Sequence, residues 1–127
     1  MADPDINDVP PIDDYNRLLD GKVAVVTGGG TGIGGAISRL FARHGALVEV
    51  VDIDADVANE AVAEITAAGG TARAIVADVR NEGDVARMRD EVLSKHGRID
   101  NLVNNVGDYR PLVRFPTSGP ESWQAMY

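Results

Sequence analysis

The stretch from Lys22 to Gly35 reads Lys-Val-Ala-Val-Val-Thr-Gly-Gly-Gly-Thr-Gly-Ile-Gly-Gly. It opens with a run of branched apolar residues, which suits a strand buried on both faces of a parallel sheet. Glycines follow, and they let the backbone turn sharply and approach a bulky anion without a Cβ in the way. A helical pattern begins directly behind them, so its unpaired N–H groups and positive dipole end point at that anion. The stretch therefore predicts the strand, turn and helix that hold a dinucleotide pyrophosphate.

The glycine spacing fits two patterns. Gly30, Gly32 and Gly35 match G-x-G-x-x-G, which any glycine-rich turn can match by chance. A longer pattern, Thr-Gly-x-x-x-Gly-Ile-Gly, runs from Thr27 to Gly34. A flexible turn without a ligand is the alternative interpretation. The position after a strand and before a helix, with an acidic residue further on, favours the dinucleotide site.

Strands and helices alternate along the rest of the chain. We expect strands at residues 22–27, 47–51, 71–77 and 99–104 and helices at residues 32–44 and 55–67, with a third helix capped by Asn81 and ended by Gly97. Ser118-x-x-Glu121 reads as the capping box of a fourth helix. Such alternation implies an α/β fold, a Rossmann-type doubly wound parallel sheet in a three-layer α/β/α arrangement, truncated after about four strands.

Apolar periodicity predicts which helix faces meet the sheet. The first helix carries an apolar stripe near helical period, made of Ile33, Ile37, Leu40 and Phe41. The second has Val57, Ala61 and Ile65 at four-residue steps, and the third is expected to turn Val85, Met88 and Val92 to the sheet.

Composition excludes several classes of function. The 127 residues suit one modest domain, and the net charge of −8 argues against a nucleic-acid or anionic-membrane partner. Without cysteine there is no disulfide, thiol nucleophile or thiolate metal site. His44 and His96 each precede a glycine at a predicted helix end, where imidazole favours the helix dipole or bonds the last carbonyls, so we expect no metal site.

The N-terminal segment differs from the rest. Residues 1–20 are acidic and contain three prolines, which predicts a poorly ordered leader before a domain at 21–127. Neither the order of a signal peptide nor an apolar stretch of membrane-spanning length occurs. We therefore expect a cytoplasmic protein.

Asp52 ends the second predicted strand, eighteen residues after Gly34, close to the offset of an acid that binds an adenosine ribose. A carboxylate there accepts hydrogen bonds from both ribose hydroxyls and repels the extra 2′-phosphate of NADP. Thr31 and Ile53 flank that region, and neither supplies the cation that a 2′-phosphate needs. The sequence thus predicts NAD over NADP. The alternative is a helix-capping Asp52, although Asp54 is available for that role.

The longer glycine pattern, with the strand-two acid, resembles the cofactor loop of the short-chain dehydrogenases/reductases, NAD(P)-dependent oxidoreductases with a Rossmann fold. The resemblance covers residues 22–127 and implies an NAD-binding Rossmann half-domain, incomplete at its C-terminus. A homo-oligomer is expected if the chain is complete. The family transfers a hydride between nicotinamide and an alcohol or ketone.

Two further motifs stand in the family's order. Asp78-Val79 follows strand three, and the resemblance implies that Asp78 bonds the adenine amino group while Val79 packs on the ring. Asn104-Asn105-Val106-Gly107 resembles the family's Asn-Asn-Ala-Gly, which implies that Asn105 and the residues after it stabilise the sheet and line the ribose. Val106 replaces a usually small residue. On spacing alone, Asp78 is equally a turn residue and Asn-Asn-x-Gly only a loop signal. The predicted cofactor-binding residues are Gly28, Thr31, Gly32, Ile33, Gly34, Asp52, Ile53, Asp78, Val79, Asn105, Val106 and Gly107.

The family's catalytic Tyr-x-x-x-Lys does not occur in this sequence. Leu19, Val113 and the chain end stand where a lysine would follow Tyr15, Tyr109 and Tyr127. We assign no catalytic residue and expect this chain alone to be inactive. Three readings stay open: the cofactor-binding part of an NAD-dependent oxidoreductase, a non-catalytic NAD-binding module, and an inactive truncated product.

Overall fold

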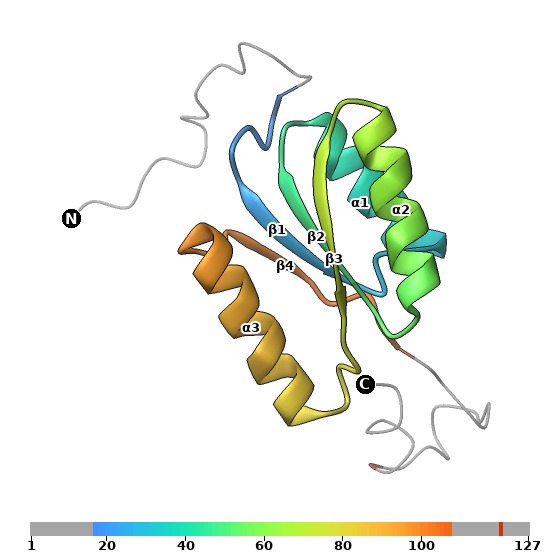
Figure 1. Ribbon diagram of the computed structural model, residues 1–127, viewed down its shortest axis with the longest axis vertical. Coiled ribbons are helices and arrows are strands. Elements are labelled where there is room, and N and C mark those ends of the chain that lie inside the picture. Colours follow the sequence, from blue (N-terminus) through green and yellow to red (C-terminus); the bar gives the residue numbers. More distant parts are fainter. Residues whose placement is uncertain (1–16, 108–119, 121–127) are drawn as a thin grey trace.

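The computed structural model describes residues 17–107 and residue 120. Its elements are β1 (Val23–Thr27), α1 (Gly32–Arg43), β2 (Leu47–Asp52), α2 (Ala55–Ala67), β3 (Thr71–Val76), α3 (Glu82–His96) and β4 (Asn101–Val103). The strands form one parallel sheet in the order β3-β2-β1-β4. Helices α1 and α2 cover one face of the sheet and α3 covers the other (Figure 1). The predicted three-layer α/β fold is confirmed.

The central strand β1 is buried along its whole length, as its run of branched residues predicts. Its side chains alternate between two cores. Ala24 and Val26 pack in the core under α1 and α2, whereas Val23 and Val25 pack in the core under α3. Both faces of β1 are therefore covered by apolar cores, although its neighbour β2 places the buried Glu49 beside Val25.

Helix α1 meets the sheet through small residues, and the predicted stripe is wrong in part. The side chains of Ile33 and Leu40 are 76% and 48% exposed, and only Ile37 and Phe41 of that stripe pack against the core. The buried residues of α1 are Gly34, Gly35, Ser38 and Ala42. Small residues let the helix backbone lie close to the sheet, which displaces the large side chains to the flanks of the contact.

The other elements follow the predictions with local corrections. Helix α2 has the predicted bounds, and Asn81 caps α3 through its side chain. Met88 and Val92 of α3 are buried, but Val85 is 36% exposed. The predicted fourth helix lies outside the described residues apart from Pro120. Within the described part, no helix is long and apolar enough to cross a membrane.

Strand β4 is shorter than the predicted 99–104, because side chains take over the pairing at both of its ends. The Asp100 carboxylate accepts a hydrogen bond from Val23 N at 2.8 Å, and Asp100 N donates to Val23 O at 2.9 Å. The bond from Val23 N, aided by the Arg98 guanidinium, lowers the pKa of Asp100. Beyond Val103, Asn105 N bonds to the Thr27 hydroxyl, so the chain leaves the ladder there.

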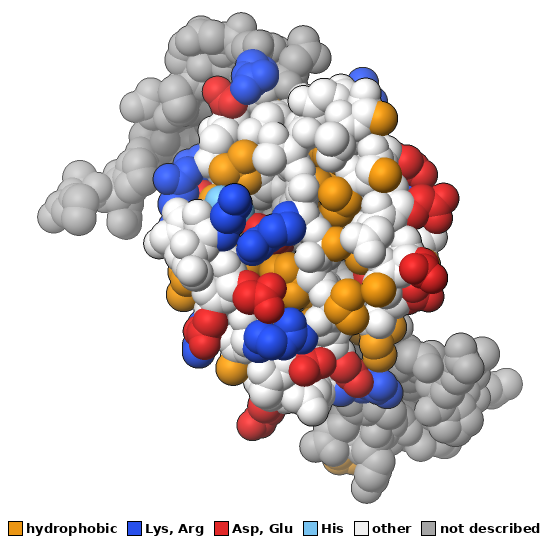
Figure 2. Space-filling model, viewed as in Figure 1, with side chains coloured by type: hydrophobic (Ala, Val, Ile, Leu, Met, Phe, Trp, Pro, Cys, Tyr) orange, Lys and Arg blue, Asp and Glu red, His pale blue; other side chains and the backbone are white. Residues whose placement is uncertain are grey.

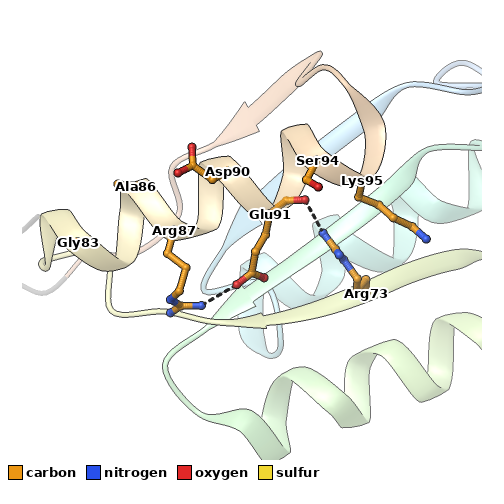
Figure 3. Close-up of a pocket in the computed structure, with 8 residues that line it drawn as sticks. All are labelled: Arg73, Gly83, Ala86, Arg87, Asp90, Glu91, Ser94 and Lys95. Carbon is orange, nitrogen blue, oxygen red and sulfur yellow. Dashed lines mark hydrogen bonds and ion pairs between the residues drawn. The ribbon is translucent and has the colours of Figure 1, made fainter.

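A buried carboxylate lies between β2 and α3. Glu49, in the middle of β2, is 1% exposed. Its Oε2 accepts a hydrogen bond from Arg73 Nε of β3 at 2.9 Å. Its Oε1 lies 2.7 Å from Nε2 of His96, which thus pairs with the sheet rather than with the last carbonyls of α3. Arg73 also donates to the carbonyl oxygen of Glu91 in α3 at 3.3 Å. This arginine lines an open groove of ≈ 760 Å³ between α3 and β3. The side chains that line the groove are drawn in Figure 3.

This cluster of Glu49, Arg73 and His96 predicts a stability effect. Arg73→Ala leaves a buried carboxylate with a single partner, and we expect a loss of about 2 kcal/mol in the free energy of unfolding, measured by urea denaturation. Arg89→Ala is the matched control, because Arg89 is 59% exposed and pairs with Asp90 on the helix surface. The control is expected to change stability by less than about 0.5 kcal/mol. Equal losses in the two variants would contradict a stabilising role for the cluster.

Candidate functional site

The carboxyl ends of all four strands lie along one edge of the sheet. Thr27 pairs with Val51, and Asp52 pairs with Val76, so β1, β2 and β3 end at neighbouring positions. The loop after β1 enters α1, and Asp52, Asp78 and residues 104–107 follow the other strands. In open parallel sheets this edge is where ligands bind.

The loop and the start of α1 touch through two glycines. A Cβ built on Gly34 would overlap the carbonyl oxygen of Gly28 and lie 2.6 Å from Nδ2 of Asn105. Gly28 itself has a φ of +59°, a conformation that favours glycine. Asn105 Nδ2 donates to Gly28 O at 3.3 Å, which ties the loop after β4 to the same point. The structure thus brings Gly28, Gly34 and Asn105 together, as the sequence predicts.

The N-terminus of α1 differs from those of the other two described helices. Asp54 and Asn81 cap α2 and α3 with their side chains, and acidic residues stand in both first turns. Thr31, the N-cap of α1, makes no side-chain capping bond, and the first turn of α1 holds no acid. Gly32 faces open space. The first-turn N–H groups of α1 thus have no side-chain cap and are open to water or to an anion, which the helix dipole favours.

Asp52 holds two backbone amides at once. Its Oδ2 accepts from Gly30 N at 3.2 Å, and its Oδ1 accepts from Asp54 N at 3.1 Å. Asp54 is the residue that caps α2, accepting from Asp56 N at 2.9 Å. A carboxylate has about four acceptor positions, so roughly two remain on Asp52 for other donors. Ile53 beside it is 62% exposed.

Asp78 is held by Arg80, which is not among the predicted site residues. Arg80 donates to Asp78 Oδ1 from its backbone N and from Nε, each at 3.0 Å, and to Oδ2 from Nη2 at 3.0 Å. These bonds lower the pKa of Asp78 and raise that of Arg80. Asp78 N donates to Asp84 Oδ2 of α3 at 2.9 Å. The carboxylate and Val79 thus follow the position of α3.

Thr27 is the second residue that is absent from the predicted cofactor-binding set, and its hydroxyl joins β1 to β4. It donates to Val103 O at 3.1 Å and accepts from Asn105 N at 3.1 Å and from Val106 N at 3.4 Å. The buried Ser38 of α1 likewise donates to Gly29 O at 2.8 Å. In the sequence, these hydrogen bonds are signalled only by a polar residue in an apolar setting. Thr27 ends a buried strand, and Ser38 lies on the buried face of α1.

The remaining predicted residues border this edge without contacting one another closely. Thr31, Ile33, Val106 and Gly107 are exposed, and Val106 approaches Gly28 through Cγ2. Within residues 17–107 and 120, no group of three or more His, Cys, Asp or Glu side chains is placed to hold a metal ion. The face in Figure 2 mixes acidic and basic side chains over α3 and the β3 edge.

Thr27→Val tests the hydroxyl bridge. The substitution keeps the shape of a side chain that is 4% exposed but removes three hydrogen bonds to β4 and its loop. We expect a loss of about 2 kcal/mol in the free energy of unfolding, measured by urea denaturation. Thr71→Val, at the exposed start of β3, is the control and should change stability by less than about 0.5 kcal/mol. A loss no larger than that of the control would show that the bridge is dispensable.

Comparison with known proteins agrees with this geometry. The model of the family described as short chain dehydrogenase matches residues 22–127. The 7alpha-hydroxysteroid dehydrogenase of Escherichia coli (strain K12) is 47% identical over 96 residues, which are 76% of this chain and 38% of that protein. The chain thus spans about two fifths of the length of this curated relative.

Two solved structures are similar in fold and contain a cofactor. A 7alpha-hydroxysteroid dehydrogenase complexed with NADH and 7-oxo glycochenodeoxycholic acid is 42% identical with a TM-score of 0.75, covering 87% of this chain and 42% of that one. A metagenomic short-chain oxidoreductase in complex with NADP is 39% identical with a TM-score of 0.74, covering 85% and 49%. These relatives therefore bind nicotinamide dinucleotides. From the fold, the glycine turn and these matches, the chain belongs to the short-chain dehydrogenase/reductase family of oxidoreductases.

Proposed function

We propose that this chain is the NAD-binding part of an oxidoreductase that transfers a hydride between nicotinamide and an alcohol or ketone. The observation that carries the proposal is the uncapped N-terminus of α1, held against β1 by Gly28 and Gly34. It offers unpaired N–H groups and a positive dipole end to a pyrophosphate. Bound NAD would supply the carbon that accepts or gives the hydride, and this chain's residues hold and orient it.

The donors and acceptors along the edge suit an adenine dinucleotide. The two acceptor positions left on Asp52 match the two hydroxyls of an adenosine ribose. Asp78 and Val79 are assigned to the adenine, and Asn105, Val106 and Gly107 to the nicotinamide side. Thr31, Gly32 and Ile33, at the open end of α1, are assigned to the pyrophosphate and its surroundings.

We propose NAD rather than NADP as the cofactor. A 2′-phosphate placed beside the Asp52 carboxylate is repelled, and the exposed neighbours Thr31 and Ile53 carry no positive charge. The related structures contain either NADH or NADP, so the family alone does not decide the preference. The carboxylate at position 52 is the observation that supports NAD.

In this proposal, the catalytic residues are part of a longer protein that contains this chain. Proton transfer to a reacting oxygen needs a positioned acid or base, and Tyr-x-x-x-Lys does not occur in this sequence. A second candidate is a module that binds NAD without catalysis, which measured NAD binding without turnover by this chain would favour. An in-frame Tyr-x-x-x-Lys after the codon for Tyr127 would decide for the oxidoreductase. We propose a cytoplasmic homo-oligomer for it, with residues 1–20 as a leader and 21–127 as the cofactor domain.

Asp52→Asn tests the cofactor assignment. The amide keeps the shape of the side chain but loses the charge and one acceptor, so the Kd for NAD should rise about tenfold. The Kd for NADP should fall or stay unchanged, because the repulsion of the 2′-phosphate is removed. Isothermal titration calorimetry of the chain with each dinucleotide measures both.

Asp54→Asn is the matched control for Asp52→Asn. It removes the same charge two residues away, and asparagine caps a helix as well as aspartate does. The NAD-to-NADP affinity ratio should stay as in the parent chain. An equal change of that ratio in both variants would overturn the role of Asp52. A chain that binds neither dinucleotide would support the inactive product instead.

A further inference from the structure

We propose that Arg80 is a positioning residue for the adenine of the dinucleotide, holding the Asp78 carboxylate so that Oδ2 faces the adenine amino group with an open acceptor position. The proposal rests on the NAD-binding function proposed above, which assigns Asp78 to the adenine. Arg80 itself contacts Asp78 and acts through it.

Arg80 grips both oxygens of one carboxylate. Nε donates to Oδ1 and Nη2 donates to Oδ2, each at 3.0 Å, in the planar fork that only a guanidinium provides. The backbone N of Arg80 adds a third bond to Oδ1, also at 3.0 Å. Together the three bonds define the plane and the rotation of the Asp78 carboxylate.

The backbone of Asp78 is fixed separately. Its N donates to Asp84 Oδ2 at 2.9 Å, and its carbonyl accepts from Asn81 N at 2.9 Å. Rotation of the side chain is therefore the main freedom left at this residue, and Arg80 removes it. An ordered acceptor binds its donor more tightly, because less side-chain entropy is lost on binding.

Counting acceptor positions locates the open one. Each carboxylate oxygen has about two, and Oδ1 fills both of its positions with the Arg80 backbone N and Nε. Oδ2 uses one for Nη2 and keeps one. The bonds from Arg80 also lower the pKa of Asp78, so the group stays a pure acceptor at neutral pH.

A pure acceptor discriminates between purines. Adenine presents an N–H donor at its exocyclic amino group, whereas hypoxanthine presents a carbonyl oxygen at the same place. A fixed carboxylate binds the first and repels the second. An ordinary surface ion pair is the competing explanation, since the Arg80 side chain is 69% exposed, and such a pair has no reason to affect this discrimination.

The test is calorimetric titration of the chain with NAD and with nicotinamide hypoxanthine dinucleotide. In the parent chain NAD should bind more tightly than the hypoxanthine analogue. Arg80→Ala should raise the Kd for NAD about fivefold and leave the Kd for the analogue within about twofold of its parent value. The affinity ratio between the two dinucleotides, which a general loss of structure does not change, is the decisive quantity.

Three further variants complete the experiment. Arg89→Ala removes an arginine that is 59% exposed and pairs with Asp90, and it should leave the ratio unchanged. In an Asp78→Asn background, Arg80→Ala should add nothing, because Arg80 acts through Asp78. Arg80→Lys keeps the charge without the fork and should lower the ratio less than alanine does, so it replaces the alanine variant if that one does not fold.

The possible failures are distinguishable. A parent chain that binds NAD, together with Arg80 variants whose ratio is unchanged, would overturn the positioning role alone. A parent chain without measurable NAD binding would overturn the proposed function and this inference with it.

Discussion

The close contact between the end of β1 and the first turn of α1 determines the geometry of the whole site. A side chain at position 34 would overlap the carbonyl of Gly28, so the helix reaches its place only because no Cβ is there. That approach aims the free amides of α1 along the edge where β2, β3 and β4 also end. It also explains why α1 packs through Ser38 and Ala42 while Ile33 and Leu40 remain exposed.

Side chains of the neighbouring strands hold this contact in place. Asn105 reaches the Gly28 carbonyl from the loop after β4, and Asp52 reaches Gly30 N from the end of β2. A Cβ on Gly30 would overlap Val57 of α2, so a larger residue at this position would force the loop or α2 to shift. The groups assigned to the cofactor thus also brace the loop that surrounds it. Preorganisation of this kind lowers the cost of ordering a site when its ligand binds.

The sequence predicted the elements of this edge better than the bonds between them. Gly28, Gly34 and Asp52 were identified because their spacing follows local backbone rules for strand, turn and helix. Thr27 was missed because its partner depends on tertiary register: Val103 pairs with β1 from 76 positions away in the chain. Arg80 was missed for another reason, since its partner Asp78 is only two residues away and no motif marks the pair. The apolar stripe of α1 was predicted from hydrophobic periodicity alone. Periodicity does not take into account that a helix face with glycine packs closer to the sheet than a face with isoleucine.

Asp78, which the proposed function assigns to the adenine, is tied to α3 through its backbone. Its N donates to Asp84 Oδ2 in the first turn of that helix. The far end of the same helix is fixed to the sheet by His96 and the buried Glu49. Removing a charge from that cluster leaves a desolvated carboxylate with fewer partners, which costs stability. Both ends of α3 are thus held by side-chain contacts, through Asp84 near its N-terminus and His96 at its C-terminus.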